Sequence, residues 1–175
     1  EAARDAGYDL PGKTMTLLGG GGAATAICVQ AALDGLKEIR VFNIKDQFYG
    51  RLEKLTANIT AKTSCKVTLH DLADEKALYD SIESSDILTN GTSVGMAPNT
   101  DACLIKNTDV FRKELIVSDV IYNPEQTKLL KLASEKGCPT FNGLYMLLYQ
   151  GAAAFKIWTG QDMPVDIIKE KYFTR

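Results

Sequence analysis

A run of four glycines near the start of the chain has the spacing of an anion-binding turn. The glycines occupy positions 19–22, after the apolar residues 15–18 and before a helix-forming run. Gly19, Gly21 and Ala24 fall on the three special positions of the G-x-G-x-x-G/A pattern, which serve a tight turn, the approach of a pyrophosphate and close helix packing. The N–H groups and positive end of the following helix then face the anion. The pattern predicts a dinucleotide site, although four consecutive glycines are also typical of a flexible loop.

A carboxylate lies where the ribose of a dinucleotide is expected. Residues 38–43 have the composition of a second strand, and Asp46 follows them. Its distance from Ala24 is close to the spacing of about 20 residues at which a ribose-binding carboxylate occurs. This second feature favours a dinucleotide site over a flexible loop.

Length and composition limit the class of protein. The 175 residues are enough for one domain with a sizeable core, which we place at residues 1–175. A net charge of −2 and a pI near 5.5 argue against a nucleic-acid partner. Neither a membrane-spanning apolar run nor a signal-peptide pattern is found in the sequence, so we expect no membrane partner and a cytoplasmic protein.

The cysteines and the single histidine do not form a metal or nucleophile motif. Cys28, Cys65, Cys103 and Cys138 lie far apart, which argues against a metal site and a disulfide framework. Cys28 falls among apolar residues of a predicted helix and is expected to be a buried structural thiol. His70 is expected at the surface or at a strand end, because no G-x-S-x-G motif accompanies it.

Hydrophobic periodicity and turn residues predict strands that alternate with helices. The expected strands are residues 14–18, 38–43, 65–69, 86–90, 115–120 and 138–141. The expected helices are the end of one at 1–7, then 23–34, 48–60, 74–84, 124–136, 144–159 and 164–173. Residues 91–107 are predicted to form a long functional loop. The fold class is therefore α/β, a Rossmann-type doubly wound parallel six-stranded sheet in the order 3-2-1-4-5-6 with helices on both faces.

This topology gathers several candidate residues at one edge of the sheet. Ligands of doubly wound sheets bind at the carboxyl ends of the strands, near the switch point between strands one and four. Gly19, Asp46, Thr92, Tyr122 and Gly143 all follow predicted strands. We therefore expect these five residues to share the ligand-binding edge.

Four ordered stretches carry a more specific pattern. They are 90–96 (N-G-T-S-V-G-M), 122–130 (Y-N-P with Thr127, Leu129 and Leu130), 142–152 (N-G, then Met146, Leu147 and Gln150-Gly151-Ala152) and 158–160 (W-T-G). These stretches resemble the N-[AG]-T-x-x-G-M, Y-x-P-x-x-T-x-L-L and [DN]-G-x-x-M-L-x-x-Q-x-A motifs of the shikimate dehydrogenases, most closely of the branch that also accepts quinate. The resemblance covers essentially the whole chain and corresponds to the C-terminal NAD(P)-binding domain of that family.

The resemblance implies roles for individual residues. Those implied to bind the cofactor are Gly19, Gly20, Gly21, Gly22 and Ala23 at the pyrophosphate, Asn43, Lys45 and Asp46 at the adenosine ribose, and Thr92, Ser93, Val120, Ile121, Tyr122, Asn123 and Gly143 toward the nicotinamide. Gln150 would reach a polyol acid substrate. Val120 and Ile121 are equally compatible with a place in the core.

The resemblance also implies an enzymatic activity for which this chain alone lacks the catalytic residues. Its members interconvert shikimate and 3-dehydroshikimate, or quinate and 3-dehydroquinate, by hydride transfer in aromatic amino acid biosynthesis. A preceding substrate domain supplies the lysine and aspartate that act on the hydroxyl, and nothing in these 175 residues matches it. We therefore expect cofactor binding without catalysis and without catalytic residues in this chain. Residues 1–13 and about 160–175 are expected to pack toward that domain. The sequence leaves open whether the protein forms a homodimer.

Two departures from the family pattern affect the cofactor. Where members that prefer NADP have Asn-Arg-Thr, this chain has Asn43-Ile44-Lys45-Asp46. The Asp46 carboxylate should make the chain bind NAD about tenfold more tightly than NADP, a difference of roughly 1.4 kcal/mol. Lys45 would partly offset its repulsion of the 2′-phosphate, so NADP binding is also expected. Tyr145 stands where the family usually has a second glycine, and its bulk is expected near the nicotinamide.

Two other functions use a similar turn. S-adenosylmethionine methyltransferases also have a glycine-rich turn after the first strand, but an acidic residue commonly precedes that turn, whereas Leu17 and Leu18 precede this one. An NAD-binding regulatory or assembly module without catalysis has the same glycine pattern. The sequence upstream of the chain would separate this module from a dehydrogenase.

Overall fold

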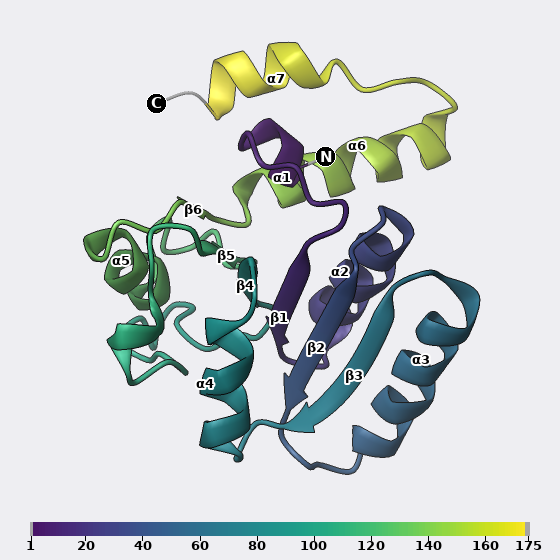
Figure 1. The fold of residues 1–175 in the computed structure, drawn as a ribbon. Helices are drawn as coiled ribbons and strands as arrows, with labels where there is room; N and C mark the ends of the chain where they lie inside the picture. The colour runs from purple at the N-terminus through teal and green to yellow at the C-terminus, as the bar shows by residue number, and fades with distance from the viewer. Residues whose placement is uncertain (1, 174–175) are drawn as a thin grey trace.

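The computed structural model describes residues 2–173 and has one twisted sheet with helices on both faces (Figure 1). The strands are β1 (Thr14–Leu18), β2 (Glu38–Asn43), β3 (Lys66–Asp71), β4 (Ile87–Asn90), β5 (Ile116–Asp119) and β6 (Thr140–Phe141). The helices are α1 (Ala2–Asp5), α2 (Gly22–Leu33), α3 (Tyr49–Lys62), α4 (Glu75–Glu83), the 3₁₀ turn η1 (Thr108–Val110), α5 (Lys128–Glu135), α6 (Leu144–Thr159) and α7 (Val165–Tyr172). All strand pairs are parallel, in the order β3-β2-β1-β4-β5-β6, which confirms the predicted fold class. Residues 91–107 form the expected loop.

The central strand divides the hydrophobic core between the two faces of the sheet. Successive side chains of a strand point to opposite faces. Met15 and Leu17 pack with α2 and α3, whereas Leu18 packs with α4 and α5. Both faces of β1 are therefore buried, as expected for a parallel sheet between two helical layers. Cys28 is 3% exposed in the first of these clusters, which confirms its prediction as a buried thiol, and burial raises its pKa to about 12.

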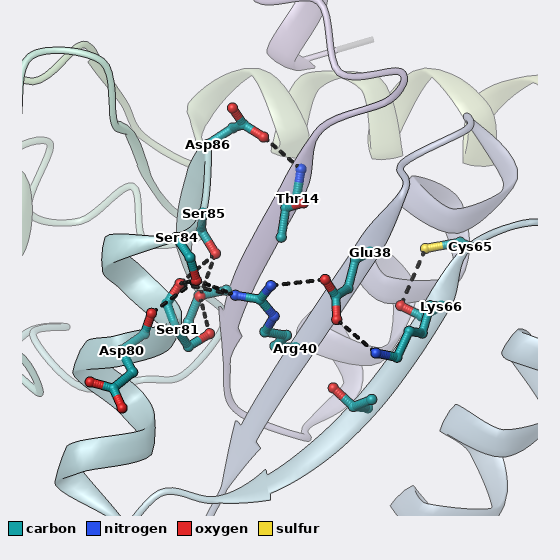
Figure 2. Close-up of polar contacts among 12 residues, drawn as sticks. Thr14, Glu38, Arg40, Cys65, Lys66, Asp80, Ser81, Ser84, Ser85 and Asp86 are labelled. Atoms are coloured by element: carbon teal, nitrogen blue, oxygen red, sulfur yellow. Dashed lines mark hydrogen bonds and ion pairs between the residues drawn. The ribbon is translucent and has the colours of Figure 1, made fainter.

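Polar side chains fix the carboxyl-terminal end of α4 to the sheet. The hydroxyl of Thr16 in β1 lies 2.7 Å from that of Ser81 and 2.8 Å from that of Ser85. Figure 2 shows Arg40 of β2 between α4 and Glu38, and its guanidinium donates to the Glu38 carboxylate at 2.8 Å. This hydrogen bond holds the pKa of Glu38 below its ordinary value. None of these side chains lines either hollow beside the glycine turn, so the contacts stabilise the sheet that carries the site.

The structure corrects one helix boundary. The helix predicted from Pro124 begins four residues later, at Lys128 in α5. The Thr127 hydroxyl accepts the Leu130 N–H at 3.4 Å and caps the helix, and it donates to the Asp119 carboxylate at 2.8 Å. The capping residue therefore determines the start of α5, and residues 120–126 remain a loop.

His70 lies within a strand that is longer than expected. β3 runs to Asp71, two residues past the predicted end, and pairs with β2. The imidazole stacks on the Phe42 ring with centroids 4.9 Å apart, and its Nε2 lies 2.9 Å from the Thr68 hydroxyl. His70 is the last residue but one of β3, which agrees with the predicted strand end, and its contacts are with neighbouring side chains of the sheet.

Helices α1, α6 and α7 lie together at one end of the molecule (Figure 1). Lys169 of α7 donates to the Asp5 carboxylate of α1 at 2.7 Å, and the Tyr8 ring stacks on Phe141 with centroids 5.6 Å apart. Of the two segments expected to face a second domain, α1 and α7 are therefore joined by an ion pair, whereas Gly12 and Lys13 bond to the backbone of residues 35 and 37. Residues 1, 174 and 175 fall outside the described part. Within residues 2–173, every helix is too short or too polar to span a bilayer.

Candidate dinucleotide site

The four glycines differ in what they do for the turn. Gly19 has φ +103°, a conformation that L side chains rarely adopt, and its backbone adjoins Thr92. A Cβ at Gly20 would lie 2.5 Å from the Leu52 side chain. A Cβ at Gly21 or at Gly22 would meet nothing within 4 Å. The first two glycines therefore allow the turn to pack, and the last two keep its outer side open.

The third position of the glycine pattern packs against the loop after β4. Ala24 is 1% exposed, and a Cβ at Gly91 would lie 2.7 Å from the Ala24 Cβ. The Gly91 N–H also donates to the Leu18 carbonyl at 2.8 Å. Small residues on both sides thus bring α2 and the β4 loop together at the switch point of the sheet.

Two hollows lie on either side of the glycine turn. The first has a volume of about 420 Å³ and is lined by Gly20, Gly21, Gly22, Thr25, Asn43, Asp46, Phe48, Arg51, Leu52 and Leu55. The second has a volume of about 460 Å³ and is lined by Gly22, Ala23, Gly91, Thr92, Ser93, Met96, Ala97, Val120, Ile121, Tyr122 and Asn123. Gly22 lines both hollows, and the linings follow the carboxyl ends of β1, β2, β4 and β5. The arrangement matches an extended ligand that crosses the turn with one half on each side.

Of the two charged residues predicted at the adenosine ribose, Asp46 lines the first hollow and Lys45 does not. Asn43 and Asp46 line it, and one Asp46 oxygen accepts the Phe48 N–H at 2.9 Å. Lys45 is absent from the lining, because its ammonium pairs with Asp71 at the end of β3, 3.4 Å away. The side chain predicted to offset the charge of Asp46 therefore lies against another carboxylate.

An amide side chain shapes the loop along the second hollow. The Asn90 carbonyl oxygen accepts the Thr92 N–H at 3.1 Å and the Thr92 hydroxyl at 2.7 Å. Its amide group donates to the Val94 carbonyl at 3.2 Å and to the Asp119 carboxylate at 3.1 Å. Asn90 is 2% exposed, so these bonds are shielded from water and hold the loop in one conformation.

A buried carboxylate supports the other wall of this hollow. Asp119 is 2% exposed and accepts the Ile121 N–H at 3.0 Å, in addition to its bonds with Asn90 and Thr127. Burial raises the pKa of Asp119, and the three donors oppose that shift. Since Asp119 joins β4, β5 and α5, it fixes the backbone that carries Val120 and Ile121. Sequence reasoning did not identify Asp119.

The remaining predicted residues lie outside the two linings. Gly143 is buried beneath the second hollow, and a Cβ there would lie 1.9 Å from the Val120 carbonyl oxygen. Its N–H donates to the Ile121 carbonyl at 3.1 Å. Gln150 is exposed on α6, two turns further along. Gly143 thus supports the wall by close packing, and the structure does not bring Gln150 to the hollow.

Tyr145 does not take the place that its position in the sequence predicts. Its ring stacks on Phe173 with centroids 6.2 Å apart, and the Lys169 ammonium lies 4.9 Å from the ring centroid. The second hollow is lined without it. Because the first turn of α6 directs the ring toward α7, its bulk leaves the hollow open.

Several lining residues were not identified from the sequence. They are Thr25, Phe48, Arg51, Leu52 and Leu55 in the first hollow and Gly91, Met96 and Ala97 in the second. Gly91 and Met96 belong to the motif at 90–96 and Ala97 follows it directly, so that motif could have supplied them. Phe48 and Arg51 carry no such signal, because only the packing of α3 beside the turn places them there.

The fold and the two hollows define a Rossmann-type dinucleotide-binding domain, and comparisons with known proteins identify its family. Residues 143–171 match the Shikimate 5'-dehydrogenase C-terminal domain family. The shikimate dehydrogenase (NADP(+)) of Listeria monocytogenes serotype 4b (strain F2365) is 55% identical over 172 residues, which are 98% of this chain and 59% of the relative. The chain belongs to the shikimate/quinate dehydrogenase family.

Solved structures agree with this identification. A crystal structure of shikimate 5-dehydrogenase from Listeria monocytogenes, in complex with shikimate and NAD, superposes with a TM-score of 0.91 at 55% identity over 97% of this chain and 58% of that one. The shikimate 5-dehydrogenase of Thermus thermophilus, in complex with NADP(H) and shikimate, gives a TM-score of 0.75 at 27% identity over 97% of this chain and 57% of that one. The chain thus spans about three fifths of the length of these relatives.

Proposed function

We propose that this chain is the NAD(P)-binding domain of an oxidoreductase that interconverts shikimate and 3-dehydroshikimate, or quinate and 3-dehydroquinate. The observation that carries the proposal is the pair of hollows that meet at Gly22, in a chain 55% identical to a shikimate dehydrogenase. The first hollow would take the adenosine half of the cofactor and the second would take the nicotinamide half. The bound cofactor supplies the hydride acceptor for oxidation of a ring alcohol.

The residues of this chain would position the cofactor for the reaction. The backbone N–H groups at the start of α2 would hold the pyrophosphate over the open side of Gly21 and Gly22. Asp46 would accept hydrogen bonds from the adenosine ribose. The wall of Val120 and Ile121, held by Asp119, would orient the nicotinamide.

A second domain would supply the catalytic groups. We place the lysine and the aspartate that act on the substrate hydroxyl in that domain, and Gln150 would contact the polyol from this side. Exposed apolar side chains support a covering domain at α6 and α7: Trp158 is 83% exposed, Ile157 81% and Ile167 65%. Burial of such side chains is worth about 1.5–3 kcal/mol each, so they are suited to an interface. The cytoplasm is the compartment we propose for the enzyme.

The proposal is tested in two steps. Calorimetric titration of the 175-residue chain with NADH should show binding, and absence of binding would overturn the proposal. The chain alone should show no shikimate- or quinate-dependent reduction of NAD, and robust turnover would show that the catalytic groups are misplaced.

A chimera separates a dehydrogenase from a regulatory module. In the Listeria monocytogenes enzyme that was solved with shikimate and NAD, this chain would replace the matching segment, and the rest of that enzyme would be kept. We expect turnover with shikimate. NADH binding by a folded chimera that lacks turnover would favour a regulatory or assembly module.

A further inference from the structure

The first hollow contains a cation that the cofactor motif does not include. Arg51 is the third residue of α3 and lines the hollow together with Asp46 and Asn43. Within residues 2–173, its guanidinium takes part in none of the ion pairs or hydrogen bonds. By contrast, Arg40 pairs with Glu38. The Arg51 side chain is exposed and available to a ligand in the hollow.

The alternative cation is already engaged. Lys45 precedes Asp46 in the chain, but its ammonium lies 3.4 Å from the Asp71 carboxylate and outside the hollow. Since β2 and β3 are paired in register up to Asn43 and Asp71, this carboxylate is fixed close to the Lys45 backbone. Lys45 is therefore poorly placed to neutralise charge on the ligand side of Asp46.

We propose that Arg51 is a specificity-determining residue that lets this chain accept the 2′-phosphate of NADP in the presence of Asp46. The inference rests on the proposed function, because it assigns the adenosine half of the cofactor to the first hollow. Asp46 would accept the ribose hydroxyls of NAD but repel the like charge of a 2′-phosphate. The planar guanidinium of Arg51 offers two parallel N–H donors to the same phosphate and offsets that repulsion.

The position of Arg51 agrees with a role in binding rather than in folding. A cation in the first turn of a helix opposes the helix dipole and is unfavourable there. The first turn of α3 contains no acidic residue that would compensate. Residues that break a local rule without a packing gain are expected at functional sites. Replacing Arg51 should therefore leave the stability of the chain unchanged or slightly higher.

The inference is tested by titrating the 175-residue chain with NAD and with NADP under the same conditions. Arg51→Gln should weaken NADP binding by about tenfold and change NAD binding by less than about twofold. Lys45→Gln should leave both affinities within about twofold. Lys54→Gln, on the exposed side of the same helix and outside the hollow, is the matched control for the loss of one positive charge.

Asp46→Ser gives the complementary result. It should strengthen NADP binding relative to NAD, and the gain should be largest while Arg51 is present. An unchanged NADP-to-NAD ratio in Arg51→Gln, or a larger shift in Lys45→Gln, would overturn the inference while the proposed function stands. A wild-type chain that binds NAD but not NADP would also overturn it. Failure to bind either nucleotide would instead overturn the proposed function, and the inference with it.

Discussion

The open side of Gly21 provides the most direct test of the phosphate turn. Gly21 precedes α2 with φ −74° and ψ −175°, a backbone conformation that any residue adopts. An added Cβ there would meet nothing within 4 Å, whereas one at Gly20 would lie 2.5 Å from Leu52. Gly21→Val should therefore fold normally, and its branched side chain should occupy the space above the first N–H groups of α2.

The expected loss follows from the hydrogen bonds that a phosphate makes in this space. A hydrogen bond to a charged group contributes about 1.5–3 kcal/mol. If the valine displaces the pyrophosphate from two such N–H groups, the loss is about 3 kcal/mol or more, which is roughly a hundredfold or more in Kd. The poorer helix cap that Val provides costs about 0.5–1 kcal/mol of folding stability and leaves the affinity of the folded chain unaffected, so the two effects are measured separately.

The assay is calorimetric titration with NADH, combined with thermal unfolding of each variant. Gly151→Val is the matched control, because a Cβ at Gly151 also meets nothing within 4 Å and lies outside both hollows. The control should bind NADH as the wild type does. Binding by folded Gly21→Val within about threefold of the wild type would refute the phosphate turn, and unfolding of that variant would refute the open position of Gly21.

Three further predictions concern the platform around the site. Gly143→Ala should destabilise the chain by about 2 kcal/mol in urea unfolding, because the new Cβ would lie 1.9 Å from the Val120 carbonyl oxygen. Gly151→Ala, whose Cβ enters open space, should instead stabilise α6 by up to about 1 kcal/mol, and equal effects of the two substitutions would contradict the close packing at Gly143. Asp119→Asn should cost about 2 kcal/mol and weaken NADH binding, since one of three buried donors loses its acceptor, and unchanged binding would show that the wall does not depend on it. The Arg40 hydrogen bond holds the pKa of Glu38 below its ordinary value of 4.5, so its stabilisation is present above that pH and is lost as the pH falls through the lowered pKa. Glu38→Gln should therefore be less stable at neutral pH and approach the wild type in acid, as chemical denaturation across pH would measure.

The glycine turn and the strand order were predicted correctly, because each follows from constraints that act locally along the chain. The tight turn at Gly19 and the small residue at Ala24 follow from backbone geometry that few residue types satisfy. Strand order followed from alternating elements and the handedness of crossovers. The turn and the sheet edge could therefore be placed without knowledge of any long-range contact.

Charge placement could not be predicted in the same way. Lys45 and Asp46 are neighbours in the chain, yet Lys45 pairs with Asp71, which a different strand brings to the end of β2. Arg51 reaches the hollow only because α3 packs beside the glycine turn, where Leu52 contacts Gly20. The partner of a surface charge depends on strand register and helix orientation, which motif spacing does not encode.

The start of α5 was predicted four residues too early, and the contacts responsible also support the candidate site. Proline favours the first turn of a helix, and this preference led to a predicted start at Pro124. The structure uses Thr127 instead, because its hydroxyl both caps α5 and bonds to the buried Asp119. Asp119 in turn fixes the Ile121 N–H, so the late start of α5 leaves residues 120–123 free to line the second hollow. Thr127 and Asp119, whose contacts delay the start of α5, therefore also support the wall of the candidate site that residues 120–123 form.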